Sequence, residues 1–205
     1  MTAGAPTGLF IGLGVATRLG ATRSLNRRVR EKVRPRANAN ATRTATAISY
    51  FGTPKAHLLL AAGLALAVRV LRGRGGPRII AASLGATAVD KLSRVVIHQK
   101  RPRRAGKHHG LDRFAFPSGH TCAITAILTA TAAELSAGLS VEADKVLWAS
   151  VACLAMGMGW SRLYLDEHWI DDVVGGLSAG LAVGLSVAEF SEQILSGGKC
   201  LKKLR

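Results

Sequence analysis

Cysteine is scarce in this sequence, and its distribution does not suit a disulfide framework. There are three cysteines among 205 residues, an odd number, and Cys122 and Cys153 both lie inside apolar runs. Neither a Cys-x-x-Cys pair nor a His-Glu-x-x-His motif is present, so His98, His108 and His109 lack the spacing of a metal centre. We therefore expect no metal ion and no cofactor.

Acidic residues are also few. Twelve Asp and Glu stand against 28 Lys and Arg, which gives a formal net charge of +16. A nucleic-acid-binding protein can carry such a charge, but here the basic residues cluster between and beyond apolar runs. That placement favours contact with anionic lipid headgroups and phosphate. We expect a bilayer with anionic lipids as the surroundings and no nucleic acid as a partner, and the oligomeric state stays open.

Apolar runs dominate the rest of the chain, at 57–71, 79–97, 120–138, 146–160 and 172–190. Several are shorter than the roughly 20 residues that a spanning helix needs, but flanking Arg and Trp side chains can extend them. They mostly lack the regularly spaced Glu and Lys of a soluble amphipathic helix, and their small residues allow close helix packing. The sequence predicts an all-α, polytopic membrane helical bundle of about five to six transmembrane helices.

The N-terminal fifty residues differ from the rest. The apolar patch at 8–17 is too short to span alone and has no positive charge ahead of it, so it does not fit a signal peptide, and a short or re-entrant first helix stays open. From Arg23 to Arg43 the only acid is Glu31, and Pro35 interrupts any helix, which favours a basic segment lying on the membrane surface. The predicted organisation is a basic N-terminal segment (1–50), a membrane-embedded core (51–192) and a basic tail (193–205).

His168 and Asp172 are four residues apart and share a face if this stretch is helical. The carboxylate would hold one imidazole nitrogen and leave the other free to attack phosphorus, which would give a phosphohistidine. Such pairs also occur by chance on helix surfaces, and Asp171 is a rival partner at a spacing of three. His168 is the candidate nucleophile.

Residues 117–120 read Pro-Ser-Gly-His and open an apolar run. Amides at a helix N-terminus can bind an anion, and Ser118 with the side-chain-free Gly119 allows close approach. His120 could then protonate the leaving oxygen as a general acid. An ordinary N-cap by Ser118 accounts for the same four residues.

Three arginines complete the candidate site: Arg94, Arg101 and Arg162. Phosphoryl transfer depends on charge stabilisation of the phosphoryl oxygens, and guanidinium groups supply it through paired hydrogen bonds. Each arginine alone is typical of a side chain that reaches the headgroup region. Together with the two histidines they indicate a phosphoryl-transfer site.

These residues resemble the type-2 phosphatidic acid phosphatase superfamily, whose signature is Lys-x6-Arg-Pro, then Pro-Ser-Gly-His, then Ser-Arg-x5-His-x3-Asp. The second and third motifs match completely, and the resemblance covers about residues 57–190. The first motif ends correctly at Arg101 and Pro102, but Arg94 stands where the family usually has Lys. Because a guanidinium is not equivalent to a compact ammonium, Lys91, one turn earlier, is an additional candidate.

The resemblance implies a metal-independent phosphoric ester hydrolase that works through a phosphohistidine. His168 would be the nucleophile, Asp172 would orient it and His120 would donate the proton. The residues implied to hold the phosphoryl group are Arg94, Arg101, Ser118, Gly119 and Arg162.

The implied substrate is a phosphomonoester or pyrophosphate of a lipid, either polyprenyl-linked or phosphatidyl. The high Arg, Ala and Gly usage favours a GC-rich bacterial genome, and hence a polyprenyl phosphate of cell wall biogenesis. In bacterial members of the family the active site usually faces outward, which implies a bacterial cell membrane with the site outside. The positive-inside rule gives conflicting orientations for the different basic segments of this chain. The alternatives are a phosphatase of small soluble esters and a non-catalytic scaffold, and the scaffold would be expected to have lost one of the matching motif residues.

Overall fold

The computed structural model describes residues 2–33, 38–73, 75–102 and 108–202, with side chains described as far as Glu189. Within these ranges every regular element is a helix, which confirms the predicted fold class. The elements are α1 (Gly4–Arg18), α2 (Arg23–Val33), α3 (Ala39–Tyr50), α4 (Pro54–Arg72), α5 (Pro77–Val96), the 3₁₀ helix η1 (Gly110–Arg113), α6 (Gly119–Ser136), α7 (Val141–Tyr164) and α8 (Ile170–Lys202).

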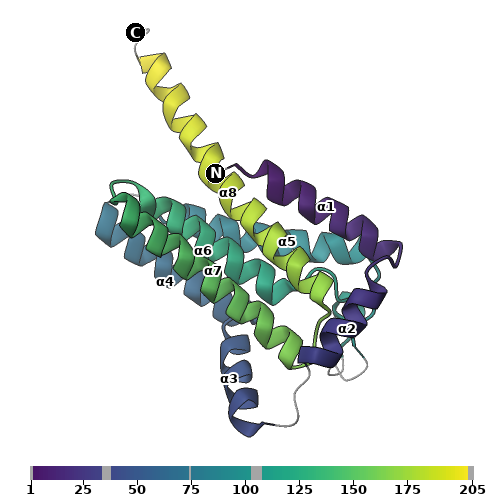
Figure 1. The fold of residues 1–205 in the computed structure, drawn as a ribbon. Coiled ribbons are helices and arrows are strands. Elements are labelled where there is room, and N and C mark those ends of the chain that lie inside the picture. Colours follow the sequence, from purple (N-terminus) through teal and green to yellow (C-terminus); the bar gives the residue numbers. More distant parts are fainter. Residues whose placement is uncertain (1, 34–37, 74, 103–107, 203–205) are drawn as a thin grey trace.

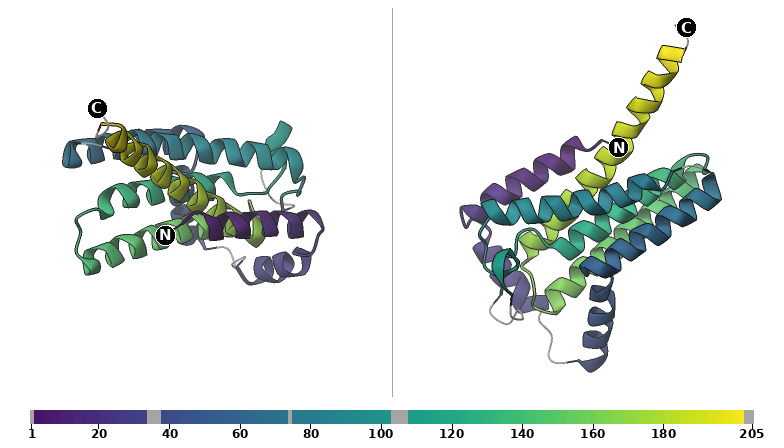
Figure 2. Two further views of the ribbon diagram at one scale, coloured as in Figure 1. Left: turned by 90° about the horizontal axis from the view of Figure 1, so that it is seen from above. Right: turned by 180° about the vertical axis from the view of Figure 1, so that it is seen from behind.

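Helix α6 forms the centre of the bundle and packs against α5, α7 and α8 (Figures 1 and 2). Helix α4 packs on α5 and α6, and α1 lies along α8. The five predicted apolar runs correspond to α4 through α8. Helices α4, α7 and α8 extend beyond their runs at both ends, whereas α5 and α6 begin before their runs and end before the runs do. The interior consists largely of small side chains, such as Ala82, Ala126 and Ala130.

Close packing of α6 and α8 depends on a glycine stripe at Gly176, Gly180 and Gly184. A Cβ atom added at Gly180 would lie 2.5 Å from the carbonyl oxygen of Cys122 and 2.6 Å from Cβ of Thr125. Small residues at a spacing of four let membrane helices approach closely, as predicted from the sequence.

Replacing Gly180 by valine is expected to destabilise the bundle by about 1–3 kcal/mol, because overpacking must push α6 and α8 apart. Thermal unfolding in detergent measures the effect as a lower Tm. The matched control is Gly157→Val on α7, where an added Cβ has no atom within 4 Å. Equal Tm losses in the two variants would contradict the role given to the stripe.

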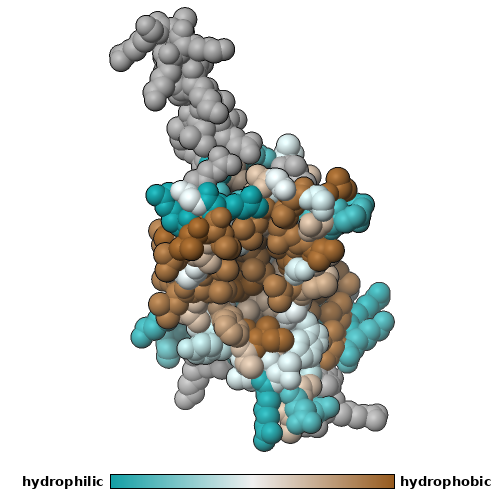
Figure 3. Space-filling view, turned by 90° about the vertical axis from the view of Figure 1, so that its left-hand side faces the viewer, coloured by the Kyte–Doolittle hydropathy of each residue, from teal (hydrophilic) through white to brown (hydrophobic). Residues whose placement is uncertain are grey.

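Helices α4, α7 and α8 are long and apolar enough to cross a membrane by length and composition. In space-filling view, hydrophobic residues form a band with hydrophilic residues above and below it (Figure 3). Helix α6 carries Thr121, Thr125 and Thr129, which lower its hydropathy but are buried inside the bundle. Helix α1 has 15 residues, so it is about 22 Å long, shorter than the roughly 30 Å of a hydrocarbon core.

The basic N-terminal segment packs against the helical bundle. Helices α2 and α3 sit at the end of the bundle where α7 ends and α8 begins (Figure 1), and both contact α7. Arg30 on α2 forms a double ion pair with Asp166, Nε to Oδ1 and Nη2 to Oδ2, both at 2.6 Å. This pairing raises the pKa of Arg30. Pro35 lies outside the described residues, and the division at residues 50 and 192 stays a prediction.

Candidate active site

The segment between α7 and α8 carries His168, which is 3% exposed. Its Nδ1 lies 3.3 Å from Oδ2 of Asp172, one turn into α8, and its Nε2 lies 2.9 Å from Nη1 of Arg101. A guanidinium can only donate hydrogen bonds, so Nε2 must be the acceptor and the proton must lie on Nδ1. The unprotonated nitrogen, which carries the lone pair that a nucleophile needs, therefore faces the arginine.

Burial and four cationic or polar neighbours keep His168 neutral. Desolvation lowers the pKa of His168 well below its usual value, and nearby charges lower it further. In order of effect after burial, these neighbours are Arg101, Arg162, His120 and Arg94. The structure therefore brings together all of the histidines and arginines proposed from the three motifs.

Asp172 rather than Asp171 faces the imidazole. Oδ2 of Asp172 also accepts the backbone N–H of Trp169 at 2.8 Å, so the carboxylate is fixed from two sides. Asp171 is turned the other way, where its Oδ2 accepts from Thr17 at 3.0 Å and from Thr22 at 2.5 Å. Asp171 therefore ties α8 to the end of α1, and the rival pairing is absent from this geometry.

Two of the motif arginines come from different parts of the chain: Arg101 follows α5, and Arg162 lies near the end of α7. Arg101 donates to the carbonyl oxygens of Asp112 and Glu167, at 2.8 and 2.9 Å. Burial lowers the pKa of Arg101 from its usual value, with Arg94 as the next cause, although a guanidinium stays charged in proteins. Arg162 donates from Nη1 to Oγ of Ser49 on α3. Within the described residues, the buried Nε of Arg162 has no hydrogen-bond partner, so this donor remains available to a phosphoryl oxygen.

The Pro-Ser-Gly-His motif stands at the start of α6. The backbone N–H of Ser118 donates to the carbonyl oxygen of Asp172 at 2.9 Å, which joins the second motif to the third. The Oγ of Ser118 accepts from Thr121 at 3.0 Å, and no side-chain cap bond from Ser118 to the helix N-terminus is formed. A Cβ at Gly119 would lie 3.0 Å from the carboxylate of Asp90, so only glycine fits easily here.

His120 lies on the first turn of α6, against the chain that joins α3 to α4. A Cβ added at Gly52 would lie 2.5 Å from Cδ2 of His120. Gly52 therefore allows the backbone to pack directly on the imidazole. His120 as a residue is neither fully buried nor fully exposed.

The two candidate cations of the irregular first motif differ in burial. Arg94 is 4% exposed, and it donates from Nε to Asp90 at 2.9 Å and from Nη1 to Asp112 at 3.0 Å. Lys91 is half-exposed and binds Oδ1 of Asp112 at 2.6 Å. The hydrogen bond from Lys91 lowers the pKa of Asp112. Lys91 therefore acts on the site through Asp112, while Arg94 reaches His168 electrostatically.

Replacing Arg94 by alanine is expected to cost about 2–4 kcal/mol of transition-state stabilisation, the usual effect of removing one preorganised charge donor. Arg94→Lys should retain much of the activity because it keeps the cation near Asp90. Lys91→Ala is the matched control and should have a small effect. The measurement is kcat/KM per folded protein, with Tm recorded because Asp90 loses its buried partner. A large loss in Lys91→Ala with normal rates in Arg94→Ala would transfer the role to Lys91.

Several residues around the site were missed by sequence reasoning. Gln99 donates from Nε2 to both Asp171 and Asp172, at 2.9 and 3.0 Å. Asp90 could have been found from its spacing of four to Arg94. Glu167 lies beside His168 in the sequence and accepts from His108 at 3.0 Å. For Gln99 no pattern in the sequence gives a signal.

The fold and these side chains define a class of protein: a helical membrane bundle in which an aspartate-oriented histidine and three arginines meet at one end. The family model of the PAP2 superfamily matches residues 8–194. The chain belongs to the PAP2 superfamily, and it is an integral membrane protein.

Two relatives agree with this assignment. The chain is 32% identical over 108 residues to phosphatidylglycerophosphatase B of Bacillus subtilis (strain 168), a match that covers 52% of this chain and 53% of that protein. The match thus spans about half the length of this curated relative. The crystal structure of a transmembrane PAP2-type phosphatidylglycerolphosphate phosphatase from Bacillus subtilis superposes with a TM-score of 0.80 at 25% identity, covering 92% of this chain and 96% of that one.

A second solved structure has a weaker likeness. Aquifex aeolicus LpxE superposes with a TM-score of 0.59 at 22% identity, and the match covers 80% of this chain and 95% of that chain. At this identity the comparison shows the fold alone.

Proposed function

We propose that this protein is a membrane lipid phosphatase, a metal-independent phosphoric ester hydrolase that acts through a phosphohistidine. The observation that carries the proposal is the position of His168, whose lone-pair nitrogen faces Arg101 while the other nitrogen is held at Asp172. A neutral, oriented imidazole among cations is what attack on a phosphate group needs.

The proposed reaction has two steps. In the first, Nε2 of His168 forms a bond to phosphorus, the bond from phosphorus to the lipid oxygen breaks, and His120 gives that oxygen its proton. In the second, His120 accepts a proton from water, the water oxygen attacks phosphorus, and the bond between phosphorus and Nε2 breaks to release phosphate. Arg94, Arg101 and Arg162 are proposed to neutralise the phosphoryl oxygens in both steps, with Ser118 and Gly119 at the start of α6 contributing to the same cradle.

We propose a lipid phosphomonoester or pyrophosphate as the substrate class. The relative named phosphatidylglycerophosphatase B makes phosphatidylglycerol phosphate the first candidate. A polyprenyl phosphate or pyrophosphate of cell wall biogenesis is the second, because the composition favours a GC-rich bacterial genome. Both kinds of lipid carry their phosphate group at the membrane surface, which is where we place the motif-bearing segments.

The test is phosphate release by the purified protein in detergent, with EDTA present, from phosphatidic acid, phosphatidylglycerol phosphate, polyprenyl phosphate, polyprenyl pyrophosphate and a small soluble ester. We expect activity on at least one lipid that EDTA does not reduce, because cationic side chains take the place of a metal ion. Activity that disappears with EDTA and returns with magnesium would refute the proposed chemistry. Faster turnover of the soluble ester than of every lipid would refute the lipid substrate.

We further propose that the motif-bearing end faces outward from a bacterial cell membrane. Support comes from the connector between α4 and α5, which is flanked by Arg72 and Arg78 and would then lie inside. The test compares Arg113→Cys in η1 with Leu139→Cys between α6 and α7, in a chain whose Cys153 and Cys200 are serine and whose remaining cysteine, Cys122, is fully buried. An impermeant thiol reagent should label the first in intact cells, and labelling of the second alone would reverse the orientation.

A further inference from the structure

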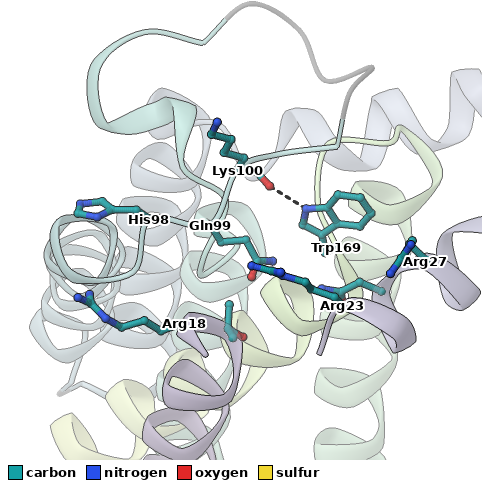
Figure 4. Close-up of a pocket in the computed structure, with 9 residues that line it drawn as sticks. Arg18, Arg23, Arg27, His98, Gln99, Lys100 and Trp169 are labelled. Carbon is teal, nitrogen blue, oxygen red and sulfur yellow. Dashed lines mark hydrogen bonds between the residues drawn. The ribbon is translucent and has the colours of Figure 1, made fainter. Parts of the chain in front are cut away.

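A cavity adjoins the candidate active site at Gln99 and Trp169 (Figure 4). Its volume is about 660 Å³, within the size range of small-ligand pockets. Its charged and aromatic walls are formed by Arg18, Arg23, Arg27, His98, Lys100 and Trp169. In Figure 4 the arginines come from α1 and α2, and His98, Gln99 and Lys100 come from the segment after α5. None of the three motif arginines is among its described lining residues.

The walls of the cavity carry more positive than negative charge. Among the nine described lining residues none has a carboxylate, and four are Arg or Lys. Within the described part of the chain, Arg23 and Arg27 form no ion pair, although Arg30 on the same helix is paired with Asp166. An excess of cations around a hollow concentrates anions there.

Two buried carboxylates, Asp171 and Asp172, accept from the lining residue Gln99 and offset only part of the charge of the four cations. Asp171 lies behind the cavity floor and is 2% exposed. Its oxygens accept from the lining residues Thr17 and Gln99, and from Thr22 outside the lining, so these neutral donors are turned away from the cavity. Trp169 is fixed in the wall because its Nε1 donates to the carbonyl oxygen of Lys100 at 2.8 Å.

We propose that this cavity is a second anion site, which binds a phosphate group independently of the phosphoryl site at His168. Guanidinium forks match tetrahedral phosphate oxygens, and arginines supply most of the cations here. The same chemistry is offered by the phosphodiester of an anionic lipid headgroup and by a free phosphate ion.

The surroundings favour the lipid source. The cavity lies at the C-terminal end of α1, and an apolar groove lies farther back along α1, between it and α8. That groove has a volume of about 620 Å³ and is lined by Leu9, Leu177, Leu181 and Leu185. A lipid with its phosphate in the cavity could lay an acyl chain along α1 toward this groove, and anionic headgroups are concentrated at such a membrane surface.

The test uses the full chain in detergent and two double variants. Arg23→Ala/Arg27→Ala removes two charges from the cavity wall. Arg28→Ala/Lys32→Ala removes two charges from exposed positions of the same helix that do not line the cavity. Both variants keep every residue proposed to bind the phosphoryl group, so binding at His168 is the same background in each, and no turnover is needed for the measurement.

One arm measures bound phosphatidylglycerol against phosphatidylcholine by native mass spectrometry, and the other measures inorganic phosphate by calorimetry. The wall variant should lose about tenfold in affinity for at least one of these anions, and the control should lose less than about twofold. Loss in the lipid arm alone identifies a headgroup site, and loss in the phosphate arm alone identifies an ion site. Equal affinities of the two variants in both arms would overturn the proposal. If the alanine variant does not fold, Arg23→Gln/Arg27→Gln replaces it.

Discussion

Replacing His168 by alanine is expected to abolish turnover, with kcat falling by about 10⁴-fold or more, as is usual when a covalent nucleophile is removed. The reason is that the imidazole of His168 is buried with Asp172 at one nitrogen and Arg101 at the other. His108 also meets a carboxylate, that of Glu167, but it is partly exposed, and the buried His57 meets Oγ of Ser83. The acid-labile phosphoenzyme formed from radiolabelled substrate should disappear with turnover. His109→Ala is the matched control, because His109 is exposed at the start of η1.

Asp172→Asn should give an intermediate loss, roughly 10²–10⁴-fold, because the imidazole remains but loses its orientation and the stabilisation of its positive charge. Asp171→Asn distinguishes the two carboxylates. It should lower Tm, because Asp171 loses its charged contacts with Thr17 and Thr22, and it should lower kcat less than Asp172→Asn does. A phosphoenzyme trapped in His168→Ala would show that another residue is the nucleophile. A larger kcat loss in Asp171→Asn than in Asp172→Asn would exchange the roles of the two carboxylates.

The core helices could be predicted from the sequence because their signal is local. Apolar runs of sufficient length identify α4 through α8, and polar connectors mark their approximate ends. The motif residues could be grouped in the same way, since His168 and Asp172 are one turn apart and Ser118 begins a helix. What the motifs could not show is how the three segments are joined, such as the bond from the Ser118 amide to the Asp172 carbonyl.

The contribution of the N-terminal helices could not be predicted, because it depends on contacts between residues far apart in the chain. Arg30 and Asp166 are separated by 136 positions, and Ser49 and Arg162 by 113. In the sequence, Arg30 is one of many arginines between residues 23 and 43, and nothing distinguishes it from Arg27 or Arg28. Only the folded bundle shows which of them pairs with the segment before α8, and which are left facing a cavity.

The same contacts give the basic segment a physical role beside the membrane. Arg162 is held by Ser49 of α3, and the segment before His168 is held by Arg30 of α2. Preorganised charges stabilise a transition state because they need not move during the reaction. We therefore interpret α2 and α3 as supports that fix the cations and the nucleophile of the proposed site.

His120 should behave differently from His168 when it is replaced by alanine. Hydrolysis of an ordinary alkyl phosphate should slow by roughly 10²–10⁴-fold, the usual contribution of a general acid. The rate of phosphoenzyme formation should fall much less for p-nitrophenyl phosphate, because p-nitrophenolate leaves without needing a proton, whereas the second step loses its proton acceptor with either substrate. The phosphoenzyme should still form from this second substrate, since His168 and its arginines are unchanged.

The comparison of leaving groups carries its own control, because both substrates meet the same folded variant. Any loss of packing between His120 and Gly52 lowers the two rates together and leaves their ratio unchanged. A change in the ratio of at least tenfold relative to the wild type therefore reports proton donation and not stability. Equal losses in the rate of phosphoenzyme formation for good and poor leaving groups would remove His120 from the role of acid in the first step.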